Sequence, residues 1–284
     1  MSKFDPYEHL NISLNPDGSL TRFIKLPTSP ATGDSGQIPG QAVVSKDVIL
    51  NAEKKTWMRI YRPTKLPSND NSIARLPIII FFHCGGWITM SIADTIIHEQ
   101  SNRISSEVQA IVVAVWLRDY GDFSRCYLYG VSCGANIAFN AAQRMLDHKL
   151  EPLTIAGIIL NQPFFGGKNR TKSELKLATD QYFPLPVQDL LWELALPQGT
   201  DRDHRFCNPF IDGPIKEKIK HLGRCLVIGF GGDPLIDRQQ DFVQMLVQQG
   251  VLVEARFDDV GFHGIHLIDT RRASAIFNFI KEFL

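Results

Sequence analysis

The sequence has no excess of charge of either sign. Its 284 residues include 30 lysines and arginines and 30 aspartates and glutamates, and no stretch of the chain concentrates one sign. Proteins that bind nucleic acids or anionic membrane surfaces need a concentrated basic surface. We therefore expect no nucleic acid and no membrane among the partners, and small neutral or apolar ligands fit the composition better.

The sequence also lacks cysteine pairs with the spacing of a disulfide framework or a metal site. There are five cysteines, and none belongs to a C-x-x-C pair. The first ten residues, MSKFDPYEHL, contain neither the basic nor the apolar region of a secretory signal, and no apolar run reaches membrane-spanning length. These absences predict a cytoplasmic protein with reduced cysteines and without a bound metal.

Short apolar runs alternate with segments of helical period. The apolar runs lie at residues 76–82, 110–115, 126–130, 155–160, 225–230 and 251–257, and the helical segments at 92–108, 134–146, 237–249 and 271–284. An uninterrupted apolar run is typical of a strand that is buried on both faces. The repeated order predicts one α/β domain over residues 1–284, with a mostly parallel central sheet flanked by helices.

The pentapeptide Gly130-Val131-Ser132-Cys133-Gly134 has the form G-x-S-x-G and lies between an expected strand and an expected helix. This is the context of the nucleophile elbow of α/β hydrolases, in which a sharp turn presents the serine. The glycines are needed because the turn brings the strand and the helix too close for side chains. Such pentapeptides also occur by chance, but the flanking elements favour Ser132 as a nucleophile.

A serine nucleophile needs an acid and a histidine base, which follow it along the chain in this fold. Asp233 and His263 lie just beyond the expected strands at 225–230 and 251–257. They are therefore expected at the same edge of the sheet as Ser132. His263 would take the proton of Ser132, and Asp233 would orient the imidazole.

Two neighbouring residues offer alternatives to this pair. Asp237 is a second acid near the same strand, but it falls where a helix is expected to begin, and a role as helix N-cap accounts for it. His266 is a second histidine in the last loop, further from the strand end than His263. Asp233 and His263 are the assignments that we favour.

The segment His83-Cys84-Gly85-Gly86-Trp87 follows a buried apolar run and precedes the first long helix. In esterases and lipases an H-G-G-G loop at this place donates backbone N–H groups to the oxyanion of the tetrahedral intermediate. We expect Gly85 and Gly86 to donate from this loop, and Cys133 to donate from the position after the nucleophile. A plain turn after a strand is the alternative interpretation.

Together these motifs resemble the plant carboxylesterase family, a branch of the hormone-sensitive-lipase-like α/β hydrolases that includes 2-hydroxyisoflavanone dehydratase and the gibberellin receptor. The similarity covers nearly the whole chain. It also rests on LNPDGS at 14–19, DFSR at 122–125, PFFGG at 163–167, RTKSEL at 170–175, DRDH at 201–204, GDPLID at 232–237 and GFH at 261–263. The resemblance implies the α/β-hydrolase fold, ester hydrolysis without a cofactor, and the triad Ser132, Asp233 and His263.

The leading hypothesis is a serine carboxylesterase that cleaves small apolar carboxylic esters through an acyl-enzyme. Two alternatives stay open: a non-catalytic binding protein, as the gibberellin receptor is, and a lyase or cyclase, as the dehydratase is. We expect substrate contacts from Trp87 and Phe262 beside the site motifs, and from a cap formed by residues 1–40 and 181–196. The apolar residues of 181–196 fit an ordinary core equally well.

The chain departs from this family by a missing block. Family members carry a Y-R-L-A-P-E-H motif and a helix after the strand at 110–115, and neither stands here between Val115 and Trp116. Parallel neighbouring strands need a crossover of about a dozen residues. We therefore expect an extended strap, a displaced strand or a damaged variant, with Val113, Val115 and Leu128 losing their cover.

Three further departures lie in the site itself. Cys84 replaces the first glycine of the H-G-G-G loop, Val131 replaces an acidic residue, and Cys133 replaces an alanine. Glycine is preferred where the backbone angle suits no other residue. We therefore expect Cys84 to misdirect the donors at Gly85 and Gly86 and to lower the rate of reaction.

Overall fold

A central eight-stranded sheet organises the molecule, as shown by a computed structural model that describes residues 4–33, 40–53, 56–65, 68–69, 72–73, 75–112, 121–211 and 213–284. The strand order is β12-β11-β10-β9-β7-β8-β4-β3. The strands are β3 (Val43–Asn51), β4 (Thr56–Pro63), β7 (Leu76–Phe82), β8 (Ile111–Val112), β9 (Gly121–Val131), β10 (Ile155–Asn161), β11 (Arg224–Phe230) and β12 (Leu252–Asp258). All pairs from β8 to β12 are parallel, whereas β3–β4 and β4–β8 are antiparallel. The predicted, mostly parallel sheet is confirmed.

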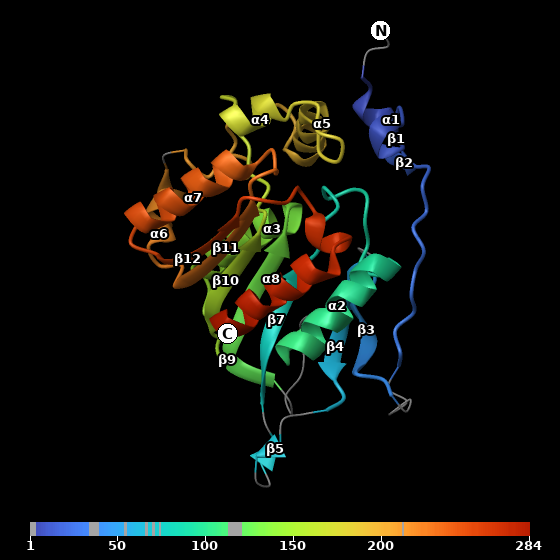
Figure 1. Cartoon of the computed structure of the whole chain (residues 1–284), viewed down its shortest axis with the longest axis vertical. Coiled ribbons are helices and arrows are strands. Elements are labelled where there is room, and N and C mark those ends of the chain that lie inside the picture. Colours follow the sequence, from blue (N-terminus) through green and yellow to red (C-terminus); the bar gives the residue numbers. More distant parts are fainter. Residues whose placement is uncertain are drawn as a thin grey trace.

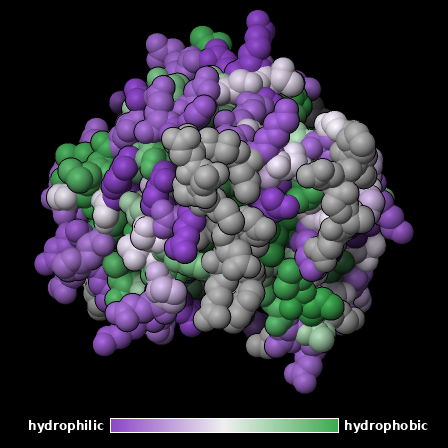
Figure 2. Space-filling model, turned by 90° about the horizontal axis from the view of Figure 1, so that it is seen from below, coloured by the Kyte–Doolittle hydropathy of each residue, from purple (hydrophilic) through white to green (hydrophobic). Residues whose placement is uncertain are grey.

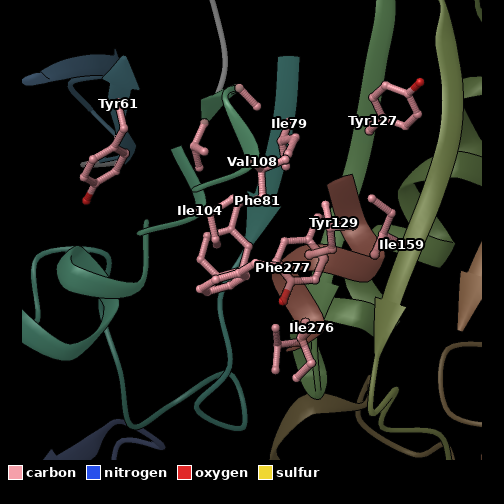
Figure 3. Close-up of a cluster of buried hydrophobic side chains, with 14 of the residues drawn as sticks. Tyr61, Ile79, Phe81, Ile104, Val108, Tyr127, Tyr129, Ile159, Ile276 and Phe277 are labelled. Carbon is pink, nitrogen blue, oxygen red and sulfur yellow. The ribbon is translucent and has the colours of Figure 1, made fainter. Parts of the chain in front are cut away.

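Helices cover both faces of this sheet (Figure 1). On one face α2 (Thr95–Val108) and α8 (Thr270–Phe283) pack against apolar side chains of β7, β9 and β10. Figure 3 shows part of this core, in which Ile104 of α2 and Phe277 of α8 lie near Phe81 and Tyr129 of the sheet. On the other face α3 (Cys133–Met145) and α7 (Ile236–Gln248) bury a second apolar cluster. The double cover explains why the inner strands are continuous apolar runs.

The shorter elements lie outside the main sheet. They are α1 (Pro6–Leu10), β1 (Ile12–Leu14), β2 (Leu20–Arg22), β5 (Ser68–Asn69), β6 (Ser72–Ile73), α4 (Lys172–Lys176), α5 (Leu185–Ala195), α6 (Pro214–Ile219) and the 3-10 turn η1 (Ile265–Leu267). Helix α1 contacts α5, so these parts of the two segments predicted to form a cap lie side by side (Figure 1). None of the helices within the described residues is long and apolar enough to cross a membrane.

A buried ion pair fastens the segment around α4 to the body of the domain. Nε and Nη2 of Arg238 donate to the two carboxylate oxygens of Glu174. The Arg238 side chain is 6% exposed and the Glu174 side chain is 2% exposed. The guanidinium also donates to the carbonyl oxygens of Gly166 at 2.9 Å and Asn169 at 2.7 Å. Because breaking one partner would leave a buried charge unpaired, this pair fixes the position of α4 over α7.

The strand β8 keeps its place beside β7, with Ile78 opposite Ile111 and Ile79 opposite Val112. The expectation of a displaced strand is therefore wrong for the described part of β8. Residues 113–120, with Val113 and Val115, lie outside the described residues. The expectation that Leu128 loses its cover is wrong, because Leu128 is fully buried in the cluster with α3.

The side chains that do border an opening on the α3 face come from other elements. A cavity of about 340 Å³ is lined by β4, the end of β7, the loop that follows β7 and the first part of α3. In its wall Trp57 of β4 and Phe82 of β7 are half-buried, and Ile137 of α3 is exposed at 36%. At the end of the molecule near β5, hydrophilic residues cover most of the described surface and hydrophobic ones form separate patches (Figure 2).

Candidate active site

Ser132 occupies the turn between β9 and α3, with φ of 56° and ψ of −119°. A side chain at Gly130 would place its Cβ 2.2 Å from the carbonyl oxygen of Gly134, and one at Gly134 would lie 2.0 Å from the carbonyl oxygen of Phe82. Both positions therefore accept only glycine. This is the reason predicted for the G-x-S-x-G pattern, and the strained backbone of Ser132 is typical of a functional turn.

The three residues predicted as nucleophile, base and acid meet at one edge of the sheet. The hydroxyl oxygen of Ser132 lies 2.8 Å from Nε2 of His263, and Nδ1 of His263 lies 2.9 Å from Oδ2 of Asp233. They follow β9, β12 and β11, the edge at which parallel sheets place their sites. The geometry is that of a serine, a base within reach of its proton, and a carboxylate that orients the base.

Four hydrogen bonds converge on the carboxylate of Asp233, which is fully buried. Besides His263, the amide nitrogens of Gln162 and Gln239 donate to Oδ2 at 2.9 Å each, and the backbone N–H of Leu235 donates to Oδ1 at 2.9 Å. These donors compensate the burial of a negative charge. Sequence reasoning missed both glutamines, although Gln162 could have been noticed as the residue directly after the strand β10.

Asp237 and His266, the alternatives to Asp233 and His263, are not part of the triad. Asp237 accepts a hydrogen bond from the backbone N–H of Ser173 at 2.7 Å, at the start of α4. The predicted N-cap role is wrong in detail, because Leu235 is the N-cap of α7 and Asp237 lies inside that helix.

His266 is buried, and neither of its ring nitrogens has a hydrogen-bond partner among the described residues. Burial lowers the pKa of His266 to about 3, with a smaller contribution from the nearby His263.

The loop after β7 has the backbone expected of an oxyanion hole. Gly85 and Gly86 have φ of 113° and 56°. Added Cβ atoms would lie 2.7 Å from Met90 and 2.7 Å from Leu191, so both positions need glycine. Within the described part of the chain, neither glycine N–H donates to a backbone carbonyl oxygen, although the N–H of Gly86 lies near the thiol of Cys133. They are therefore available as donors.

The expectation that Cys84 misdirects this loop through its backbone angle is wrong. Cys84 is not among the residues with positive φ. Its side chain is buried, and the thiol donates toward the sulfur of Met90 at 3.8 Å. Burial raises the pKa of Cys84 to about 12, so the thiol stays neutral and acts as a small apolar group.

Cys133 begins α3, and the first N–H groups of a helix have no partner within the helix. Its backbone N–H can therefore serve as the third donor. The thiol is buried, and burial raises its pKa against the opposing effect of the nearby N–H groups of Trp87 and Gly86. The side chain that replaces alanine thus lies directly beside the oxyanion loop.

The two predicted substrate-binding residues pack against different aromatic side chains. Phe262 stacks on Tyr182, with ring centroids 4.6 Å apart. Trp87 packs against Phe164 and Trp192 and lines a groove of about 780 Å³ that runs along α3. Ser132 does not line this groove. Phe262 directly precedes the proposed base, and Trp87 directly follows Gly86 in the oxyanion loop and also lines the 340 Å³ cavity together with Cys84 and Cys133.

Comparison with known proteins identifies the relatives of this chain. Residues 114–267 match a family described as having the α/β hydrolase fold. Probable carboxylesterase 9 of Arabidopsis thaliana is 50% identical over 99% of this chain and 97% of its own length. The chain belongs to the plant carboxylesterase family. The hyperthermophilic esterase of the archaeon Pyrobaculum calidifontis has the same fold, with a TM-score of 0.67, 20% identity, and coverage of 84% of this chain and 85% of that chain.

Two further comparisons concern this carboxylesterase. The alignment with the Arabidopsis relative spans 317 positions and the chain has 284 residues, so at least 33 positions of the alignment have no residue here. The gibberellin receptor GID1C of Arabidopsis thaliana is 28% identical over 91% of this chain and 85% of its own length.

Among the residues that the structure describes, no group of three or more histidine, cysteine, aspartate or glutamate side chains is arranged to hold a metal ion.

Proposed function

We propose that this protein hydrolyses carboxylic esters through an acyl-enzyme. The observation that carries the proposal is the continuous chain from Ser132 through His263 to Asp233, with separations of 2.8 and 2.9 Å. His263 accepts the proton of Ser132 as its oxygen attacks the ester carbonyl carbon, and Asp233 stabilises the imidazolium that forms. The proton then passes to the alcohol oxygen, the ester C–O bond breaks, and the alcohol leaves.

Water completes the cycle by the same route. His263 removes a proton from a water molecule as its oxygen attacks the acyl carbon of Ser132, and the carboxylic acid leaves when the serine oxygen recovers a proton. In both halves the negative charge on the former carbonyl oxygen accepts hydrogen bonds from the N–H groups of Gly85, Gly86 and Cys133. Donors fixed before the reaction begins contribute most, because they need no reorganisation.

The surroundings of Ser132 favour small apolar acyl and alcohol groups. Ser132 is only 6% exposed, and the cluster on this side of the sheet is apolar and largely aromatic, with Phe164, Phe183, Leu191 and Trp192. Because α1 contacts α5 above this cluster, we propose that residues 1–40 and 181–196 form a cap over the substrate. Ester hydrolysis by these residues requires no cofactor.

The test is reaction with a fluorophosphonate probe and with short-chain p-nitrophenyl esters. The wild type is expected to be labelled and to hydrolyse the esters. Ser132→Ala and His263→Ala are each expected to abolish labelling and to lower kcat by about a thousandfold or more, since members of a triad act as a unit. His266→Ala serves as the control and is expected to keep most of the activity.

Each rival has its own outcome. A non-catalytic binding protein would leave the wild type unlabelled and inactive, and a lyase or cyclase would be labelled but would release no acid from an ester. A loss of activity in His266→Ala together with an active His263→Ala would show that the base is wrong.

We also propose that the protein works in the cytoplasm. All five cysteines are free and buried, which is the state expected in a reducing compartment. A fluorescent fusion that enters the secretory pathway would contradict this location.

A further inference from the structure

Backbone strain singles out one residue whose role the triad does not explain. Five residues other than glycine have positive φ in the described part of the chain: Asn11, Trp87, Gln109, Ser132 and Gln162. Asn11 and Gln109 are C-caps of α1 and α2, where the left-handed conformation is common. Ser132 and Trp87 belong to the elbow and the oxyanion loop. Gln162, with φ of 49°, remains, and such outliers cluster at functional sites.

The side chain of Gln162 joins the acid to the loop that carries the base. Its amide nitrogen donates to Oδ2 of Asp233 at 2.9 Å and to the carbonyl oxygen of Phe262 at 3.0 Å, while its amide oxygen accepts from the N–H of Gly264 at 3.0 Å. Phe262 and Gly264 are the residues on either side of His263. Gln162 is 1% exposed, so no water competes for these bonds.

We infer that Gln162 is a positioning residue that fixes the imidazole of His263 between Asp233 and Ser132. The inference rests on the proposed function of this triad. The planar amide of Gln162 bonds to the carboxylate of Asp233 and to both neighbours of His263. A shift of the carboxylate or of the histidine loop would therefore break a bond to this amide. The left-handed backbone at position 162 turns the side chain from the end of β10 toward the other two loops, which accounts for the strain.

Gln239 provides a matched control. Its amide nitrogen donates to the same oxygen of Asp233 at 2.9 Å, and its amide oxygen has no partner among the described residues. Replacing either glutamine by methionine keeps the length and volume of the side chain and removes one donor from Asp233. Only the change at position 162 also releases the two bonds to the His263 loop.

Steady-state hydrolysis of a p-nitrophenyl ester separates the two effects. Gln162→Met is expected to lower kcat by about 10- to 100-fold with KM within about twofold, because a misplacement of about 1 Å can cost a hundredfold. Gln239→Met is expected to lose less than about fivefold, since only one of four bonds to Asp233 is lost. Equal kcat values for the two variants would overturn the inference.

Proton NMR of the Nδ1 proton shared by His263 and Asp233 gives a readout that does not depend on turnover. Its downfield signal is expected in the wild type and in Gln239→Met, and is expected to broaden or vanish in Gln162→Met. An unchanged signal in Gln162→Met would overturn the inference. If the wild type hydrolyses no ester, the proposed function fails and the NMR comparison alone decides the role of Gln162.

A second variant covers the case in which Gln162→Met does not fold. Gln162→Glu keeps the oxygen that accepts from Gly264 and adds a negative charge beside Asp233. The variant loses the donor to Asp233 and to the carbonyl oxygen of Phe262, so kcat is expected to fall by at least about tenfold with KM within about twofold. A purely structural role would lower the melting temperature and leave kcat of the folded variant close to that of the wild type, and this result would also overturn the inference.

Discussion

The ring of Phe183 lies flat against the imidazole of His263, with centroids 4.3 Å apart and planes inclined by 13°. Phe183 precedes α5, and its carbonyl oxygen accepts from the side chain of Gln188 at 2.9 Å. The segment predicted as a cap therefore touches the proposed base directly. Of its apolar residues, Val187, Leu191 and Trp192 are buried core, so the segment serves the core and the site together.

Removal of this stacked ring should slow the reaction without unfolding the protein. Stacked aromatic pairs contribute about 0.5 to 1.5 kcal/mol beyond their buried area, so we expect Phe183→Leu to lower kcat by about two- to tenfold. Tyr182→Leu is the control, because Tyr182 is 52% exposed and stacks on Phe262, not on the histidine. The test compares kcat and the melting temperature of both variants with those of the wild type. Equal kcat values for Phe183→Leu and Tyr182→Leu would show that Phe183 only fills space.

His266 should make the protein sensitive to acid. Its pKa is lowered to about 3 by burial, from an ordinary value of 6.5. Between these values the unfolded chain binds a proton that the folded chain does not, so the free energy of unfolding falls as the pH is lowered from 6.5 toward 3. The decrease amounts to about 1.4 kcal/mol per pH unit.

His266→Leu is expected to remove this contribution. The melting temperature of the variant should fall less steeply than that of the wild type between pH 7 and pH 4.5, since leucine has no charged form to exclude. His148→Leu, at an exposed position, is the control and should leave the slope unchanged. Parallel curves for the wild type and His266→Leu would mean that other groups cause the acid sensitivity.

Restoring the missing crossover should stabilise the fold. A version with a family-type Y-R-L-A-P-E-H segment and helix inserted between Val115 and Trp116 would cover Trp57, Phe82 and Ile137, which border the cavity beside α3. Full burial of one apolar side chain contributes roughly 1.5 to 3 kcal/mol. We therefore expect the insertion to raise the melting temperature and to reduce binding of a hydrophobic dye.

An insertion of the same length made of glycine and serine is the first control and should not stabilise the protein. Ile137→Ser gives the second, because Ile137 is 36% exposed as the chain stands. It should cost little in the present chain and more in the version with the helix. Equal melting temperatures with and without the helical insertion would show that the present connection closes the sheet adequately.

The sequence alone determined the architecture and the candidate triad. Buried parallel strands must be continuously apolar, and the elbow must have glycine at positions 130 and 134, so both leave a local pattern in the chain. Placement just after β9, β11 and β12 favoured Ser132, Asp233 and His263, because the carboxyl ends of parallel strands meet at one edge.

Only the tertiary structure decided how these residues are held. Gln162 and Gln239 reach Asp233 from different elements, Phe183 reaches His263 from the cap, and Leu128 is covered by α3. None of these contacts follows a spacing along the chain. Hydrogen bonds and packing between distant segments depend on where the folded backbone brings the side chains, and a local pattern carries no record of that distance.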